Sequence, residues 1–380
     1  MTTPARPRLL IISFSPIASD ARVLKQVRAF AERYRVTTCG YGPSPDDDVE
    51  HLRIGDDVRA DDTEFKLIAA RLWRVAYSST GAVREARRLL RGRRFDVVLA
   101  DDVETVPVAL EIAPASKVHA DLHEYSPRLH DEVPAWMRWR APYVRWLCRR
   151  FAAKAASTTT VGNGLAREYQ REFGFLPEVV TNATPYVDLT PSAGAEPVRL
   201  VHSGAALRNR DLGLLVDGVA RASRPTTLDL FLQPNEPAYL EELKVQAAGS
   251  GGRVTVHPPV PYDQLIDTLH AYDVGVHVLP PVNFNNRNAL PNKFFDYVQA
   301  RLGLIVGPSA EMAQTVKDRG LGLVTSDFTA EALATALDGL TAADAARFKA
   351  ASAEAAHELS AEQQVAGWVR AIDRIAGLAA

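Results

Sequence analysis

The chain has 380 residues, of which 47% are hydrophobic, and this is enough for two domains of ordinary size with packed cores. Its 44 lysines and arginines nearly balance its 46 aspartates and glutamates, which excludes a protein whose whole surface binds nucleic acid. The only cysteines, Cys39 and Cys148, are too few for a disulfide framework, which predicts a cytoplasmic location. No apolar run approaches the ~20 residues of a membrane span, and no signal peptide is predicted.

Short apolar runs rich in β-branched residues alternate with helical patterns, which is typical of parallel sheets covered by helices. The strands predicted in the first half lie at residues 9–14, 36–41, 97–100, 118–122, 158–161 and 179–181. Those predicted in the second half lie at 200–203, 228–232, 254–257, 274–279, 304–306 and 323–325. The pattern predicts an α/β protein with two Rossmann-like, doubly wound domains facing a cleft, where ligands bind at the strand ends.

A stretch rich in proline and small residues, 190–197, is predicted to link the two domains. The N-terminal domain would then cover residues 1–189, and the C-terminal domain residues 198–359. A terminal helical segment, 360–380, would follow.

The terminal segment has a helical pattern of its own. Ser360 and Gln363 have the spacing of a capping box at its start. An apolar stripe then follows at helical spacing, formed by Val365, Trp368, Val369, Ile372 and Ile375. The stripe must be buried, either on the second domain or by a return of the helix to the first.

Residues 203–213, SGAALRNRDLG, follow a predicted strand and open a helix near Asp211. The small residues Ser203 and Gly204 would let backbone N–H groups approach a phosphate, and Arg208 and Arg210 would supply guanidinium donors. A plain turn between a strand and a helix, with solvated arginines, would have the same sequence.

Residues 283–307 contain a second candidate anion site. Leu290 and Pro291 mark a helix start, since proline is favoured at the first helical position. The N–H groups of Asn292 and Lys293 would then point out of the helix N-terminus, and the Lys293 side chain adds a full charge. Asp296, one turn on, could accept hydrogen bonds from vicinal hydroxyls such as those of a ribose. The alternative is a structural helix with a solvated Asp296 and core aromatic residues.

Residues 288–307 resemble the nucleotide-sugar site of the retaining GT-B-fold glycosyltransferases, the family that includes sucrose synthase and the phosphatidylinositol mannosyltransferases. Asn288 and Asp296 stand where that family has two glutamates. The resemblance implies that Asp296 holds the ribose hydroxyls of the donor and that Asn288 contacts its sugar. The chain departs from the family at Gln299 and Arg301, where a small residue and a glycine are usual.

The resemblance extends to further motifs in the same chain order. The loop that faces the phosphates on the acceptor side matches residues 15–22, and the family's histidine motif matches residues 121–125, DLHEY. The acceptor-side residues implied are Ser15, Pro16, Asp20, Arg22 and Glu124. The catalytic residues implied are His123, through contact with the donor sugar, and Asn288. The donor-binding residues implied are Ser203, Gly204, Arg208, Arg210, Pro259, Val260, Leu290, Asn292, Lys293 and Asp296, with Pro259 and Val260 recognising the base.

The function implied is transfer of a hexose-type sugar from a nucleotide-diphosphate sugar to an acceptor hydroxyl with retention of configuration, without metal, cofactor or protein base. The acceptor would be a glycan, a lipid or a natural product. His123 beside Asp121 and Glu124 has the chemistry of a general base, but the resemblance to retaining enzymes assigns it to sugar binding. Two other functions stay open: a nucleotide-sugar epimerase, and a catalytically idle scaffold that binds sugar nucleotides.

Aspartate pairs such as Asp101-Asp102 would suit a metal, but most of them lie in the polar stretch 43–62, which is predicted to be a solvated loop. No metal requirement is predicted.

Residues 136–154 interleave aromatic and basic side chains, which suits peripheral contact with a membrane or binding of an anionic acceptor. The alternative is a helix that packs behind the His123 motif.

Overall fold

The computed structural model describes residues 6–378 and divides the chain into two compact units. The first unit combines Met1–Thr181 with Gln364–Ala380, and the second is Asn182–Gln363. Each unit contains one sheet of parallel strands, with the order β3-β2-β1-β4-β5-β6-β7 in the first and β10-β9-β8-β11-β12-β13 in the second. Two doubly wound α/β units therefore confirm the predicted fold class.

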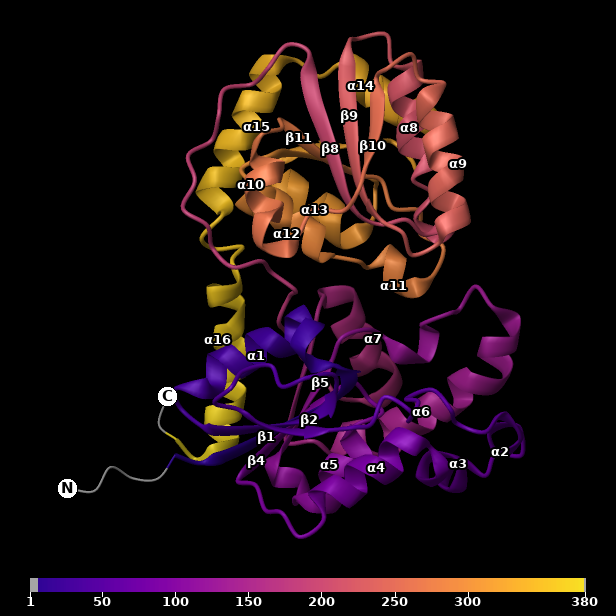
Figure 1. The fold of residues 1–380 in the computed structure, drawn as a ribbon, viewed down its shortest axis with the longest axis vertical. Helices are drawn as coiled ribbons and strands as arrows, with labels where there is room; N and C mark the ends of the chain where they lie inside the picture. The colour runs from indigo at the N-terminus through magenta and orange to yellow at the C-terminus, as the bar shows by residue number, and fades with distance from the viewer. Residues whose placement is uncertain (1–5, 379–380) are drawn as a thin grey trace, which may run out of the picture. The chain divides into compact units, whose positions relative to one another are not determined.

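The first unit surrounds its seven-stranded sheet with helices (Figure 1). Its strands are β1 (Arg8–Pro16), β2 (Arg35–Tyr41), β3 (Glu50–Arg53), β4 (Val97–Asp101), β5 (Val118–Leu122), β6 (Ser157–Thr160) and β7 (Glu178–Val179). Its helices are α1 (Ala21–Ala31), α2 (Phe65–Ala69), α3 (Trp73–Ser79), α4 (Gly81–Leu90), α5 (Val106–Ile112), α6 (Ala141–Arg150), α7 (Asn163–Phe173) and α16 (Ala361–Ala376). Short turns of helix are η1 (Ile17–Ser19), η2 (Ala115–Lys117), η3 (Ser126–Arg128), η4 (Trp136–Arg140) and η5 (Ala152–Lys154).

The second unit has the same layered construction around six strands. These are β8 (Val198–Ala205), β9 (Thr226–Gln233), β10 (Val254–His257), β11 (Val274–His277), β12 (Gly303–Val306) and β13 (Gly322–Val324). Its helices are α8 (Gly213–Arg221), α9 (Pro237–Ala248), α10 (Leu265–His270), α11 (Phe284–Arg287), α12 (Asn292–Gln299), α13 (Ala310–Arg319), α14 (Ala330–Asp338) and α15 (Ala342–Ala355), with the turns η6 (Arg208–Arg210) and η7 (Tyr262–Gln264).

The central strands carry continuous apolar runs because helices cover both faces of a parallel sheet. Leu9, Leu10, Ile11 and Ile12 of β1 are all fully buried, for example. The prediction of a solvated loop at 43–62 is wrong for β3, which pairs with β2 at the edge of the sheet. Only one side chain of β3 is buried, so a strand this short gave no alternating pattern in the sequence.

The terminal helix α16 belongs to the first unit from Gln364 onward. Trp368 and Ile372 lie in its core, and the other residues of the predicted stripe pack against them. The Tyr34 hydroxyl donates to Asp373 Oδ1 at 2.6 Å, and the Arg22 guanidinium lies 4.5 Å from the centre of the Trp368 ring. The helix thus buries its stripe by returning to the first unit.

The predicted capping box is not formed. The Ser360 hydroxyl is buried without a hydrogen-bond partner among the residues described. The N–H of Ala361, where α16 begins, donates instead to the carbonyl of Thr184 at 2.9 Å. A backbone carbonyl from another segment has therefore replaced the local cap.

The boundary between the units lies before the predicted linker at 190–197, because residues 182–189 are bound to the second unit. Arg301 donates to the carbonyls of Val187 at 2.5 Å and Leu189 at 3.1 Å. Gln299 accepts from the Val187 N–H at 3.1 Å. Gln299 and Arg301, which depart from the pattern of the family that the sequence resembles, therefore hold residues 182–189 in place.

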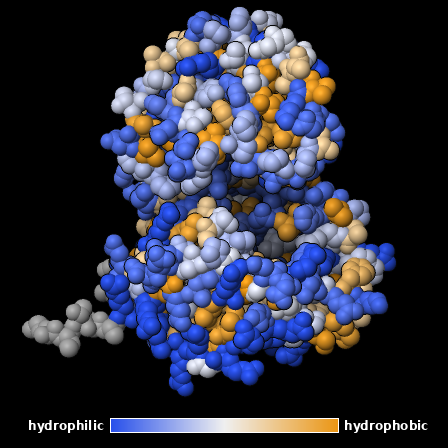
Figure 2. All heavy atoms as spheres, viewed as in Figure 1, coloured by the Kyte–Doolittle hydropathy of each residue, from blue (hydrophilic) through white to orange (hydrophobic). Residues whose placement is uncertain are grey.

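The surface in Figure 2 is largely hydrophilic, with hydrophobic residues at the edge of the first unit that carries α2 and α3. Phe65, Leu72 and Val75 are about half exposed there. Between residues 6 and 378, no helix combines the length and the apolar composition that a membrane span requires.

Replacing Trp368 with Ala should destabilise the first unit by about 3–5 kcal/mol, because a fully buried aromatic ring and its contact with Arg22 are lost. Denaturant unfolding of the full chain, followed by far-UV circular dichroism, measures the change. Arg370→Ala on the same helix is the control, since it removes only a surface ion pair with Glu178 and should cost less than about 1 kcal/mol. Equal effects of the two substitutions would contradict the assignment of Trp368 to the core.

Candidate active site

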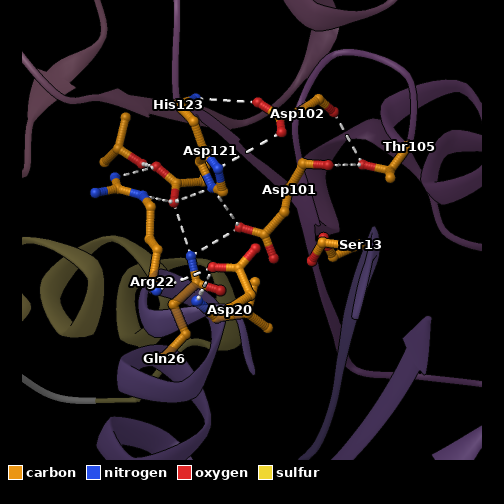
Figure 3. A network of polar contacts seen from close by, with 12 residues as sticks. Ser13, Asp20, Arg22, Gln26, Asp101, Asp102, Thr105, Asp121 and His123 are labelled. Carbon is orange, nitrogen blue, oxygen red and sulfur yellow. Dashed lines mark hydrogen bonds and ion pairs between the residues drawn. The ribbon is translucent and has the colours of Figure 1, made fainter. Parts of the chain in front are cut away.

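The carboxyl ends of β4 and β5 bring three ionisable side chains of the first unit together (Figure 3). Asp101 ends β4 and is paired in register with Asp121 of β5, and His123 follows β5 directly. Because the ends of parallel strands meet at one edge of a sheet, the predicted histidine motif joins an aspartate pair that lies about twenty residues earlier in the chain.

Asp121 is held by a buried, bidentate ion pair with Arg22 of α1. Arg22 Nη2 donates to Asp121 Oδ1 at 2.6 Å, and Nε donates to Oδ2 at 2.7 Å. Thr159 donates to the same carboxylate at 2.6 Å. Burial opposes the ionisation of Asp121, but Arg22 and His123 hold the pKa of its carboxyl well below the usual range. Arg22, predicted on the acceptor side, therefore lies buried within the network.

His123 lies among three carboxylates. Its Nε2 atom is 3.3 Å from Asp101 Oδ1 and 3.5 Å from Asp121 Oδ2, and its Nδ1 atom is 3.5 Å from Asp102 Oδ2. Burial disfavours the charged ring, but Asp102, Asp101 and Asp121 raise the pKa of His123 well above its usual value. The three carboxylates therefore favour the protonated ring, which suits His123 to donating hydrogen bonds and argues against a role as general base.

Asp101 and Asp102 differ in environment. Burial raises the pKa of Asp101 to about 7, against the opposing effect of His123. Asp102 has a left-handed backbone with φ of 63° and accepts from the N–H of His123 at 3.2 Å. Such a conformation is uncommon for a residue other than glycine and is found at ligand sites more often than elsewhere.

Asp101, Asp121 and His123 offer ligand atoms within 4.8 Å of one another, which is close enough for a metal ion. Arg22, however, already donates to both oxygens of Asp121, and His123 supplies a positive charge of its own. The three residues therefore fit an ion-paired network better than a site for a cation.

Two adjoining cavities lie in the first unit beside this network. The larger has a volume of about 490 Å³, and its walls include Ser15, Asp101 and Asp102. The smaller cavity, of about 250 Å³, is lined by His123 and Glu124. It shares Asp102, among other residues, with the larger cavity. Of the other residues predicted on the acceptor side, Pro16 ends β1 at the surface, and Asp20 caps the N-terminus of α1.

In the second unit, the predicted phosphate loop, residues 203–213, contacts Lys293 at the predicted helix start. Gly204, near the end of β8, has φ of 145°, and a Cβ atom there would lie 2.7 Å from Lys293 Nζ. The positive φ therefore favours glycine, and a Cβ atom at this position would displace the flexible end of the Lys293 side chain. Burial and the Arg210 guanidinium lower the pKa of Lys293 to about 7, while Asp296 acts in the opposite direction.

Two histidines lie beside Lys293, His202 within β8 and His277 at the end of β11. His202 Nε2 is 3.5 Å from Lys293 Nζ, and the rings of His202 and His277 are 5.6 Å apart. Burial, Lys293 and Arg210 lower the pKa of both histidines well below the usual value, so both are neutral. His202 Nδ1 lies 2.8 Å from the carbonyl of Val276, which assigns the proton to Nδ1 and leaves Nε2 as the acceptor facing Lys293.

Helix α12 begins at Asn292, one residue later than predicted, with Pro291 as its N-cap and no side chain capping it. Asn292 is exposed, and Leu290 packs at the edge of the core. Asp296 is buried, and its Oδ1 atom accepts from the Thr184 hydroxyl at 2.5 Å. Its role in ribose binding stays a prediction.

The other predicted donor residues occupy several different positions in the second unit. Arg208 differs from the predicted clamp because it pairs with Glu236 and Glu242 near α9. Asn288 ends α11 and donates its side-chain amide to the carbonyl of Phe284 at 2.9 Å. Pro259 and Val260 follow β10, which is separated from β8 by β9. Ser203 is buried, and its N–H donates to the Tyr297 hydroxyl at 3.4 Å.

Several residues of these sites are not among those predicted from the sequence. His277 ends the otherwise apolar strand β11, and His202 directly precedes the predicted phosphate loop in β8; these positions were the available signals. For Asp101 and Asp102, the aspartate pair suggests only a metal site, which is not predicted here. Gln26, whose side-chain amide donates to Asp101 at 2.8 Å and to Asp121 at 2.7 Å, lies within an amphipathic helix and gave no signal.

Comparison with solved structures shows extensive similarity in fold at low sequence identity. Anabaena Alr3699/HepE, solved in complex with UDP and glucose, matches with a TM-score of 0.68 and 13% identity over 97% of this chain and 100% of that one. The α,α-trehalose 6-phosphate synthase of Burkholderia multivorans matches with a TM-score of 0.68 and 12% identity over 98% of this chain and 99% of that one. Sucrose-phosphate synthase of Thermosynechococcus elongatus matches with a TM-score of 0.66 and 14% identity over 97% and 99%.

No protein-family model matches the sequence, and no curated protein matches it either. The structural matches span nearly the whole chain and both doubly wound units. The chain therefore has the same fold as these structures, the GT-B fold of two doubly wound domains.

Replacing Asp102 with Asn should lower the pKa of His123, because the carboxylate that raises it most is removed. Asparagine keeps the side-chain shape and tolerates the left-handed backbone. NMR titration of the His123 ring measures the change, with Asp131→Asn, in the pair with Arg128, as control. Since folding raises the pKa of His123, its stabilising effect is complete below about pH 6.5 and is lost as the pH rises through the raised value. An unchanged or higher midpoint in Asp102→Asn would contradict this account.

Proposed function

We propose that this protein is a glycosyltransferase that uses a nucleoside diphosphate sugar as donor. The observation that carries the proposal is the cationic site of Lys293 and Arg210 beside Gly204, at the end of β8 and the start of α12. A fold shared with proteins crystallised with UDP and UDP-glucose supports it.

The second unit would bind the donor. Lys293 and Arg210 would contact the diphosphate, together with the N–H groups at the start of α12, which no side chain caps. Neutral His202 accepts from Lys293, which orients the ammonium group without adding a competing charge. Asp296 would hold the ribose hydroxyls, with Thr184 fixing its carboxylate, and Asn288 would contact the sugar.

The first unit would bind the acceptor beside His123. A charged His123 suits donation of a hydrogen bond to a sugar hydroxyl, and it cannot remove the acceptor's proton. We therefore propose transfer with retention of configuration, without a metal ion. The bond between the anomeric carbon and the diphosphate breaks as the acceptor oxygen bonds to that carbon, and a diphosphate oxygen takes the acceptor's proton. Lys293 and Arg210 would stabilise the charge that develops on the leaving diphosphate.

The aromatic and basic segment 136–154 contributes to this acceptor side. Tyr143, Val144 and Leu147 of α6 are buried, and Trp136 and Val144 line the smaller cavity with His123. These contacts support the interpretation of a helix packed behind the His123 motif. Peripheral membrane contact through the exposed basic residues of this segment stays a proposal.

Lys293→Met should weaken UDP binding about tenfold or more, because a charge-assisted hydrogen bond contributes about 1.5–3 kcal/mol. The pKa of Lys293 is about 7, so at pH 8 most of the free protein carries a neutral lysine that must gain a proton when the diphosphate binds. Calorimetry at pH 8 in two buffers of different ionisation enthalpy should show proton uptake that Lys293→Met abolishes. Lys244→Met, at an exposed ion pair with Glu241, is the control. Unchanged affinity and proton uptake in Lys293→Met would place the diphosphate elsewhere.

With UDP-glucose as donor and an acceptor found by screening, the product should have the anomeric configuration of the donor, and a chelator should leave the rate unchanged. Proton NMR of the glycoside reports the configuration. Release of UDP that depends on the acceptor would distinguish a transferase from an epimerase or an idle binder. An inverted product would overturn the proposed mechanism.

A further inference from the structure

The larger cavity of the first unit has an apolar wall made of aromatic and aliphatic side chains. Tyr77, Trp136 and Tyr143 contribute the aromatic rings, and Val83 and Val144 contribute the aliphatic groups. The two tyrosines and the two valines are buried. A volume of about 490 Å³ lies within the range of sites that bind small organic molecules. The cavity is therefore large enough for a ring system and has a surface that suits one.

The two tyrosine rings of this wall are held from outside the cavity. The ring of Tyr77 stacks on that of Phe151, with centroids 6.5 Å apart and planes inclined by 23°. The ring of Tyr143 stacks on that of Trp146 in the same way, at 6.0 Å and 25°. Because these contacts fix the rings in advance, a flat ligand can pack against them at little cost in conformational entropy.

Most hydroxyl groups on the cavity wall form hydrogen bonds within the protein. These bonds are Thr80 to the carbonyl of Ala76 (3.2 Å), Thr63 with Thr80 (3.0 Å), Thr105 to the carbonyl of Asp101 (2.7 Å), Tyr77 to the carbonyl of Glu104 (2.8 Å) and Ser13 with Ser15 (2.8 Å). Within residues 6–378, they leave one O–H of the serine pair and the Tyr143 hydroxyl for a ligand. A sugar would lose hydrogen bonds to water at many hydroxyls without replacing them, whereas a ring with a single hydroxyl would not.

The carboxyl groups of the wall already face positive or hydrogen-bonding groups of the protein. The neighbouring charges are Arg59 for Asp61, His123 for Asp102 and Arg140 for Glu104. Asp101 directs its carboxylate at Gln26 and His123 (Figure 3). An ionic ligand would lose its hydration without gaining a counter-ion of its own, so the wall favours a neutral ligand.

We propose that this cavity binds a neutral acceptor with an aromatic ring system and a single hydroxyl, such as a phenol or a naphthol. The ring system would lie against Tyr77, Tyr143 and Trp136, and the hydroxyl would face the smaller cavity. Trp136 and Val144 line both cavities, and His123 lines the smaller one, so the hydroxyl would lie next to the proposed site of transfer. The role of acceptor rests on the proposed function, whereas binding of the aromatic compound does not.

Three compounds test this proposal at pH 7 without any donor. They are 2-naphthol, its anionic relative 6-hydroxy-2-naphthoate, and maltose, which has two rings but many hydroxyls. Calorimetric titration of the full chain measures the three affinities. The naphthol should bind about tenfold or more tightly than either of the other two compounds. Equal or tighter binding of maltose or of the naphthoate would overturn the proposal.

Two neighbouring tryptophans provide a matched pair of variants. Trp136→Ala should weaken binding of 2-naphthol about tenfold, because it removes one ring of the wall. Trp139→Ala is the control, since Trp139 lies on the same turn, η4, but packs against Phe65 with centroids 5.9 Å apart and lines neither cavity. Unchanged affinity in Trp136→Ala, or equal losses in both variants, would contradict the assignment of the cavity.

A second pair of variants tests the cavity by filling it. Leu129→Trp places a larger side chain on the wall that both cavities share and should abolish binding of 2-naphthol. Leu176→Trp, at an exposed position outside both cavities, should retain it. Far-UV circular dichroism checks that each variant is folded. Normal binding in a folded Leu129→Trp variant would place the aromatic compound elsewhere.

The affinity of the unmodified protein for UDP is measured alongside as a separate check of the proposed function. Normal UDP binding without binding of 2-naphthol would overturn this inference and leave the proposed function intact. Binding of 2-naphthol in the cavity of a protein that binds no UDP would support the specificity of the cavity and contradict the proposed function.

Discussion

The buried ion pair between Arg22 and Asp121 is the constraint on which the organisation of the first unit depends. Arg22 reaches from α1 to the end of β5, donates to the carbonyl of Val180 at 2.9 Å, and is covered by Trp368 of α16. The pair therefore joins the sheet, the first helix and the last helix at one point. Removing one partner from such a pair leaves a buried charge uncompensated, at a cost of about 3–5 kcal/mol. The return of the chain's last helix and the position of the candidate site are consequences of the same contact.

The same pair determines the charge of the site beside it. Arg22 compensates Asp121 and leaves Asp101 and Asp102 to stabilise the positive charge of His123. A charged His123 binds and orients rather than removes a proton, and this is the physical basis of the proposed mechanism.

In the second unit, Arg301 illustrates how a departure from a family pattern is accommodated. Its φ of 59° lies in the left-handed region, where glycine, the residue usual at this position in the resembling family, costs least. Its buried guanidinium offsets the strain by donating to the carbonyls of Leu189, Val298 and Gln299. Its contacts with the carbonyls of Val187 and Leu189 fix the segment that carries Thr184, the hydrogen-bond partner of Asp296. The substitution therefore links the boundary between the units to the predicted ribose site.

The sequence alone determined the fold class, all strands but one, and Gly204, Lys293 and His123 as residues at strand ends or helix starts. These features depend on local periodicity and on motif spacing, which a single chain displays. Only the tertiary structure decided that Arg208 pairs with α9 whereas Arg210 acts on Lys293, that His202 and His277 accompany that lysine, and that Arg22 is a buried partner of Asp121. It also decided where the units divide and where the last helix packs. These outcomes depend on contacts between residues far apart in the chain, and on the burial and charge balance that such contacts create, none of which has a local signature in the sequence.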